Sequence, residues 1–147
     1  MSEAGPSDSA VVLTPAAAPE ALAAGAALQG LRVDVVPTPI GCLAVCATKD
    51  AETVARGLST VLRTAPVVLI VQRDGQMTAS RWQAGAEQAQ LAAALVLDGA
   101  PREVEDLLLG AVAVGDLAGV VSSDMSRWRA ARTLASAARS ARKQARS

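Results

Sequence analysis

The stretch that decides the fold runs from residue 31 to residue 48 and reads LRVDVVPTPIGCLAVCAT. Apolar residues alternate with other residues at 31–36 and again at 42–48, which is the period-two pattern of half-buried strands. The five residues between them, 37–41, include two prolines and a glycine, so they predict a rigid turn. The stretch therefore predicts a β-hairpin with a five-residue loop.

A helix and a buried strand are expected to follow this hairpin. Val54, Leu58 and Leu62 recur at the spacing of one buried helical face, which predicts a helix over residues 50–63. The continuous run of valine, leucine and isoleucine at 67–71 predicts a central strand that is buried on both faces.

Further strands are expected on both sides of this unit. The Asp74-Gly75 pair is typical of a tight type I′ turn, so residues 77–83 should return as a polar strand at the edge of the sheet. On the N-terminal side, residues 11–13 form a short apolar run, and Pro19 suits the first turn of a helix.

The C-terminal third is predicted to be helical. Apolar spacing predicts a helix over residues 87–97, and Pro101 is expected to begin the next one. The Ser123-Asp124 pair suits the N-cap of a last helix that ends near residue 145.

The order of these elements defines the expected fold class, which is α+β. Strand, helix, strand, strand, helix, strand is the split βαβ, or ferredoxin-like, pattern of an antiparallel sheet, here with an added hairpin strand and a helical C-terminal third. A competing interpretation leaves two hairpins flanking one helix, with residues 1–30 as a loose arm. We divide the chain into a flexible leader at 1–9, a sheet domain at 10–84, a helical extension packed on it at 85–123, and a basic helix at 124–147.

Charge separates an acidic part of the chain from a basic tail. The 147 residues include 14 acidic and 14 basic side chains, so the formal net charge is zero. Residues 1–124 contain all the acids and seven bases, a net charge of −7, whereas residues 125–147 contain seven bases and no acid. Such a tail can dock on an acidic protein, including another copy of this chain, or contact nucleic-acid phosphates.

The candidate interaction residues are the two tryptophans and the bases of the tail. The chain has no phenylalanine or tyrosine, so each tryptophan is an unusually large contact surface. Tryptophan and arginine are enriched among the residues that dominate binding at interfaces. The alternative places Trp82 in the core under the C-terminal helices and packs the last helix through Met125, Trp128 and Leu134. We predict an interaction site composed of Trp82, Arg127, Trp128, Arg129, Arg132, Arg139, Arg142 and Lys143.

Nothing in the sequence indicates catalysis. The chain has no histidine, so it offers no imidazole base or ligand. Cys42 and Cys46 would lie about 13 Å apart along one strand, too far for a disulfide or a shared metal ion, and are interpreted as small core residues. The acids around 98–106 complement the start of a helix. We expect no catalytic residue, no metal site and no cofactor.

These observations favour a non-catalytic interaction or assembly module that forms a homo-oligomer or docks on a larger protein complex. Abundant alanine and arginine suggest a bacterial genome, and the two cysteines suit a reducing cytoplasm. No secretory signal is apparent, and no apolar run approaches the roughly 20 residues of a membrane span. The alternatives are nucleic-acid binding through residues 125–147 and a small-ligand regulatory domain.

Overall fold

The computed structural model describes residues 9–146, so the leader predicted at 1–9 lies, apart from Ser9, outside the described residues. Two short 3-10 helices, η1 (Thr48–Asp50) and η2 (Val114–Asp116), join the larger elements. No helix in the described range is long and apolar enough to cross a membrane. The strands and α-helices are, in chain order, β1 (Ser9–Leu13), α1 (Pro19–Leu28), β2 (Asp34–Thr38), β3 (Gly41–Ala47), α2 (Ala51–Leu62), β4 (Val67–Arg73), β5 (Gln76–Gln83), β6 (Ala86–Leu91), α3 (Ala93–Asp98), α4 (Arg102–Leu109), β7 (Val121–Ser122) and α5 (Arg127–Arg146).

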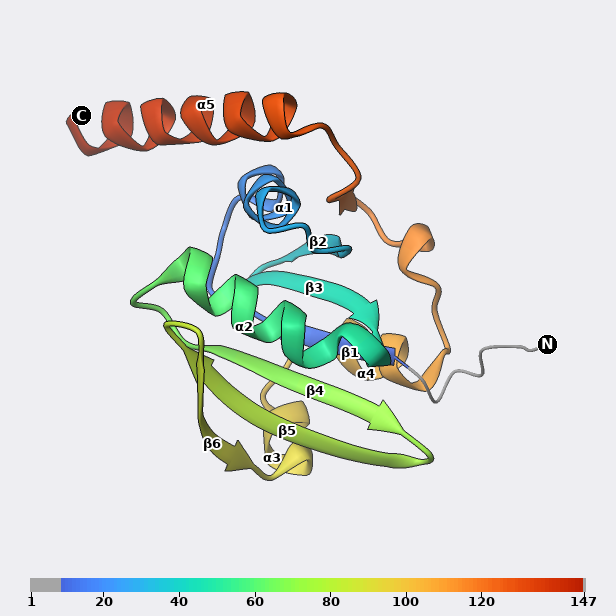
Figure 1. Cartoon of the computed structure of the whole chain (residues 1–147). Coiled ribbons are helices and arrows are strands. Elements are labelled where there is room, and N and C mark those ends of the chain that lie inside the picture. Colours follow the sequence, from blue (N-terminus) through green and yellow to red (C-terminus); the bar gives the residue numbers. More distant parts are fainter. Residues whose placement is uncertain (1–8, 147) are drawn as a thin grey trace.

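The described strands form one antiparallel sheet of seven strands in the order β6-β5-β4-β1-β3-β2-β7 (Figure 1). The fold is therefore α+β, as the sequence predicts. Strand β1 lies between β3 and β4, where Val11 is opposite Val45 on one side and Ile70 on the other. The interpretation of residues 1–30 as a loose arm is therefore wrong, because these residues supply a central strand.

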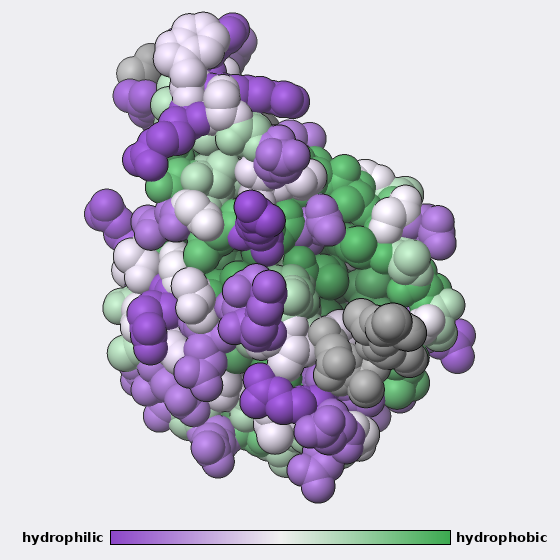
Figure 2. All heavy atoms as spheres, turned by 45° about the vertical axis from the view of Figure 1, so that its right-hand side comes forward, coloured by the Kyte–Doolittle hydropathy of each residue, from purple (hydrophilic) through white to green (hydrophobic). Residues whose placement is uncertain are grey.

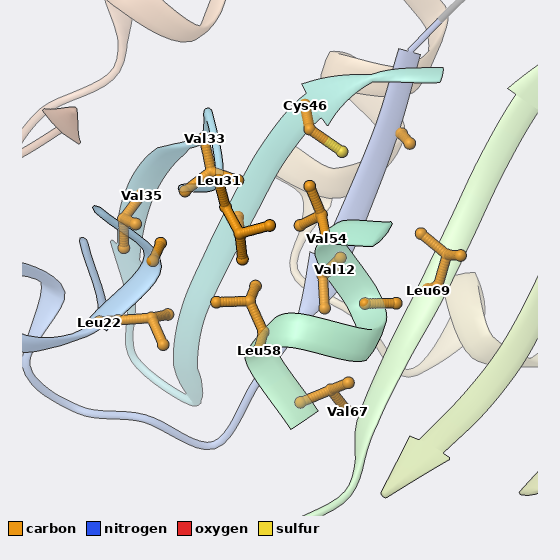
Figure 3. Close-up of a cluster of buried hydrophobic side chains, with 14 of the residues drawn as sticks. Val12, Leu22, Leu31, Val33, Val35, Cys46, Val54, Leu58, Val67 and Leu69 are labelled. Carbon is orange, nitrogen blue, oxygen red and sulfur yellow. The ribbon is translucent and has the colours of Figure 1, made fainter. Parts of the chain in front are cut away.

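Helices cover both faces of the sheet. Helices α1 and α2 lie on one face, while α3 and α4 lie on the other (Figure 1). Because neighbouring residues of a strand point to opposite faces, Val12 packs with the α1 and α2 side and Val11 with the α4 side. Figure 3 shows the first of these cores, in which Leu58 of α2 and Leu22 of α1 approach the side chains of the sheet.

The hairpin predicted at residues 31–48 forms with a shorter loop than expected. Thr38 pairs with Gly41, so only Pro39 and Ile40 make the turn. The Thr38 hydroxyl donates a hydrogen bond to the carbonyl oxygen of Gly41 and accepts one from the N–H of Ile40, which closes the turn. A Cβ atom at Gly41 would lie 2.1 Å from the carbonyl oxygen of Thr14, so this close approach requires glycine.

The helix predicted over residues 87–97 is wrong in its first part. Residues 86–91 form strand β6, and the helix α3 begins only at Ala93. The cause is a second tight turn, in which Ala84 and Gly85 both have positive φ (52° and 85°), as in the Asp74-Gly75 turn. The N–H of Gly85 donates to the buried hydroxyl of Ser59 in α2, at 2.9 Å. Strand β5 is consequently an interior strand rather than the edge strand that we expected.

Neither edge of the sheet offers a long regular strand. The pairing of β6 with β5 shifts register between Arg81 and Trp82, and β7 at the opposite edge has two residues. Bulges and very short edge strands both hinder the addition of another strand to a sheet.

The expected N-cap of the last helix has a different role. The hydroxyl of Ser123 is buried, donates to the carbonyl oxygen of Leu31 at 2.8 Å and accepts from the N–H of Val33 at 3.0 Å. It therefore ties the C-terminal segment to the start of β2. Helix α5 begins later, where the hydroxyl of Ser126 accepts from the N–H of Arg129 at 3.1 Å.

Replacement of Ser123 should destabilise the fold measurably. Ser123→Ala leaves a buried carbonyl and a buried N–H without their partner, which costs about 1–3 kcal/mol of the free energy of unfolding. Ser122→Ala is the matched control, since Ser122 is exposed and its hydroxyl accepts only from the N–H of Asp124. Urea denaturation of both variants checks this, and equal stabilities would contradict the assigned role of Ser123.

Candidate functional site

Helix α5 packs on α1 through a narrow row of small and apolar side chains. Ala130 is fully buried, while Thr133, Leu134 and Ala137 are half-buried. Their spacing of three and four residues places them on one side of the helix, which faces α1. Half of the ten residues of α1 are alanine, so this contact has little apolar bulk.

The opposite side of α5 carries a tryptophan followed by bases. Trp128, Arg132, Ala135, Arg139 and Arg142 recur every three or four residues and point about 180° away from the buried row. We call these five residues the outer face of α5. Trp128 is 69% exposed, so the alternative prediction that it packs the last helix onto the core is wrong.

A contact within the outer face holds its aromatic residue in place. The guanidinium carbon of Arg132 stands 4.7 Å from the centre of the Trp128 ring, within the range of a cation–π interaction. The pair is four residues apart on the helix, which is the spacing at which side chains meet. One apolar ring and one cation are therefore presented together.

The described bases of α5 from residue 127 to residue 143 are all exposed. Arg127 and Arg129 are also exposed and lie beside the outer face. Within the described residues, no acid pairs with any arginine between 127 and 142. The last turns of α5 extend past α1 in Figure 1, and Figure 2 shows that hydrophilic residues predominate on this projecting helix. Lys143, which belongs to the predicted interaction site, is also exposed on this helix.

Trp82 is separate from this surface. Its side chain is 3% exposed and belongs to the core beneath α2, not beneath the C-terminal helices. Its Nε1 donates to the hydroxyl of Ser80 at 2.9 Å, and the guanidinium carbon of Arg56 lies 5.7 Å from the ring centre. Trp82 therefore cannot serve as the exposed anchor that the sequence suggested, and only Trp128 remains in that position.

The two cysteines are buried free thiols of β3. Burial, followed by the negative charge of Asp50, raises the pKa of Cys46 to about 12, and burial with Glu20 also raises the pKa of Cys42. Both thiols are therefore protonated near neutral pH, and a protonated thiol is a poor nucleophile. The described residues contain no group of three or more Cys, Asp or Glu side chains placed to hold a metal ion.

Two cavities lie beside the sheet. One, of about 620 Å³, adjoins Cys46 at the end of β3, and the other, of about 660 Å³, lies between α2 and strands β4 to β6. Ligand sites usually place a few polar groups so that they converge on the ligand. Polar side chains line both cavities, among them Asp34 and Asp124 in the first and Glu52 and Arg73 in the second.

Comparison of the chain with protein-family models, with curated proteins and with solved structures found no match. The function is therefore inferred from the chemistry of the described residues.

The raised pKa of Cys46 predicts a loss of stability at alkaline pH. The unfolded thiol has its ordinary pKa of 9.0, whereas the folded thiol has a pKa of about 12. The stability that Cys46 supplies is therefore complete below pH 9 and is lost as the pH rises toward 12. Chemical denaturation from pH 8 to pH 11 should give a steeper loss for the native chain than for Cys46→Ala, and parallel curves would contradict this prediction.

Proposed function

We propose that the protein is a non-catalytic interaction module that docks on an acidic protein surface through the outer face of α5. The observation that carries this proposal is the exposed row of Trp128, Arg132 and Arg139 on the side of α5 opposite α1. No described acid neutralises these arginines. The row has no part in packing the helix, so its residue types support a role outside the fold.

The chemistry of the outer face suits carboxylate partners. A guanidinium group forms two parallel hydrogen bonds with a carboxylate, which makes arginine a strong and directional partner for acidic side chains. Trp128 adds apolar contact area beside these charges. Because α5 is already formed and anchored on α1, binding would not require the helix to order, which lowers the entropic cost of association.

Nucleic acid is the alternative partner for the same face. Phosphates also attract arginine, but proteins that bind single strands usually interleave several aromatic side chains with their bases. Trp128 is the only aromatic residue of α5, and residues 1–124 carry a net charge of −7 that repels a polyanion near the body of the molecule. These two features favour a localised acidic protein patch over a long nucleic acid.

Three broader assignments accompany this proposal. The position of β1 between β4 and β3, with α1 and α2 on one face, supports a ferredoxin-like central unit extended by β5, β6 and β7. The buried free thiols of Cys42 and Cys46 support a reducing compartment such as the cytoplasm. The arginine-rich and alanine-rich composition supports a bacterial source.

Binding of poly-L-glutamate, a simple acidic polypeptide, tests the proposed function. Trp128 is exposed and Trp82 is buried, so acrylamide should quench mainly the fluorescence of Trp128. We expect poly-L-glutamate to protect Trp128 from quenching at low salt, and the protection to disappear at about 0.5 M salt, where charges are screened beyond a few ångströms. A Trp128→Leu variant identifies the signal.

Matched charge reversals complete this test. Arg132→Glu with Arg139→Glu should weaken binding about tenfold or more, since each lost contact is replaced by repulsion. Arg73→Glu with Arg81→Glu changes the net charge equally at exposed positions away from α5. Equal losses in both variants would contradict the proposal, as would a purified protein that carries nucleic acid by its absorbance at 260 nm and releases it only at high salt.

A further inference from the structure

We propose that the acidic surface recognised by α5 is helix α4 of a second copy of this chain, an inference that rests on the proposed function of α5. The partner is identified by three properties of α4: its acids, of which Glu105 is exposed, an exposed leucine one turn further on, and a spacing that matches the outer face of α5. No other surface of the described chain is needed for this contact.

Helix α4 buries one side and carries acids on the other, of which Glu105 is exposed. Val104, Leu107 and Leu108 are buried against the sheet. Glu105 is exposed on the side away from the sheet, Asp106 beside it is half-buried, and no described base pairs with either carboxylate. A role for these acids at the start of the helix explains their charge, but it does not explain the exposed leucine at the end of the same helix.

That leucine stands one turn beyond the acids. Leu109 is 49% exposed, although it ends a helix whose other leucines are buried. It lies four residues after Glu105, so the two side chains are neighbours on the outer surface of α4. Helix α4 therefore presents an acid and a leucine one turn apart, and α5 presents a base and a tryptophan one turn apart.

These two pairs match when the helices run antiparallel. With Trp128 on Leu109, Arg132 comes opposite Glu105, because both partners are four residues along in opposite directions. Three residues further, Ala135 comes opposite Arg102 of α4, and its small side chain leaves room for that arginine. A lysine at position 135 would repel Arg102, whereas alanine permits the two helices to lie together.

The contact must join two molecules. Helix α5 packs on α1, on one face of the sheet, while α4 covers the other face (Figure 1). The two surfaces of one chain therefore cannot meet. Because different surfaces of the two copies meet, the contact is of the head-to-tail type and can continue from copy to copy. Helix α4 is only eight residues long, so each contact should be weak and sensitive to salt.

Charge-swapped variants test this pairing by sedimentation velocity at low salt. The native chain should associate in a concentration-dependent way. Arg132→Glu with Arg139→Glu makes both surfaces acidic, and Glu105→Arg with Asp106→Arg makes both surfaces basic, so each variant alone should remain a monomer. Mixing the two variants should restore association, since each acidic face then meets a basic one.

Two controls separate specific pairing from general attraction between oppositely charged proteins. Mixing Arg73→Glu/Arg81→Glu with Glu52→Arg/Glu87→Arg involves the same changes in net charge at exposed positions elsewhere. These variants should each associate as the native chain does. A Leu109→Ser variant should weaken association at unchanged charge, and unaltered association of this variant would contradict the contact between Leu109 and Trp128.

The outcomes distinguish this inference from the proposed function. A native chain that stays monomeric while it still binds poly-L-glutamate would overturn the pairing with α4 and leave the role of α5 intact. Association that survives reversal of α4 but not of α5 would likewise overturn it, since a different acidic surface would then be the partner. A native chain that neither binds poly-L-glutamate nor associates would overturn both proposals.

Discussion

The position of β1 is the constraint on which the rest of the structure depends. This five-residue strand is hydrogen-bonded to β3 on one side and to β4 on the other, and its residues Ala10, Val11 and Val12 are fully buried. Because alternate residues point to opposite faces, the strand contributes to both cores at once. Without β1, the β2-β3 hairpin and the β4-β5-β6 part would not be joined into one sheet. Neither part alone would give the helices a continuous sheet to pack on.

The layers built on this strand determine which side chains are available for binding. Helix α1 lies on the sheet, and half of its residues are alanine, so α5 packs on it through only a narrow row of residues. That narrow row leaves most of the circumference of α5 in solvent. Arginine keeps its charged end in water, so the arginines stay on this exposed part, where the guanidinium group of Arg132 also lies over the ring of Trp128.

Much of the fold could be predicted from the sequence, because its strongest patterns are local. The alternation around Pro37–Gly41 and the spacing of Val54 and Leu58 each identify an element without help from distant residues. Strand β6 could not be predicted this way, since its residues read as a helix and its turn uses Ala84-Gly85 instead of an asparagine or aspartate before glycine. The hydrogen bond from Gly85 to Ser59 of α2, which anchors this turn, joins residues 26 positions apart.

The candidate site was predictable in its charge but not in its orientation. An alanine-rich helix gives little contrast between its sides, so the sequence could not show that Ala130 is buried and Trp128 is exposed. Both tryptophans were predicted to be interaction residues, but Trp82 lies in the core and only Trp128 lies on the surface. Only the packing of α5 on α1, which depends on the whole sheet beneath it, assigns each side of the helix.

The separation of charge within the fold has a consequence for how copies of the chain meet. The formal net charge is zero, so no long-range repulsion keeps the molecules apart, and local surfaces decide whether they associate. The bulge at β6 and the shortness of β7 disfavour association through the sheet edges. Basic residues gather on α5, and the exposed acid Glu105 lies on α4, on the other side of the sheet. Under the pairing that we propose, a molecule with this layout would attract its neighbours in one relative orientation and repel them in others, because like surfaces meet unfavourably. Contact between helices, rather than between sheet edges, is therefore the form of assembly that we propose.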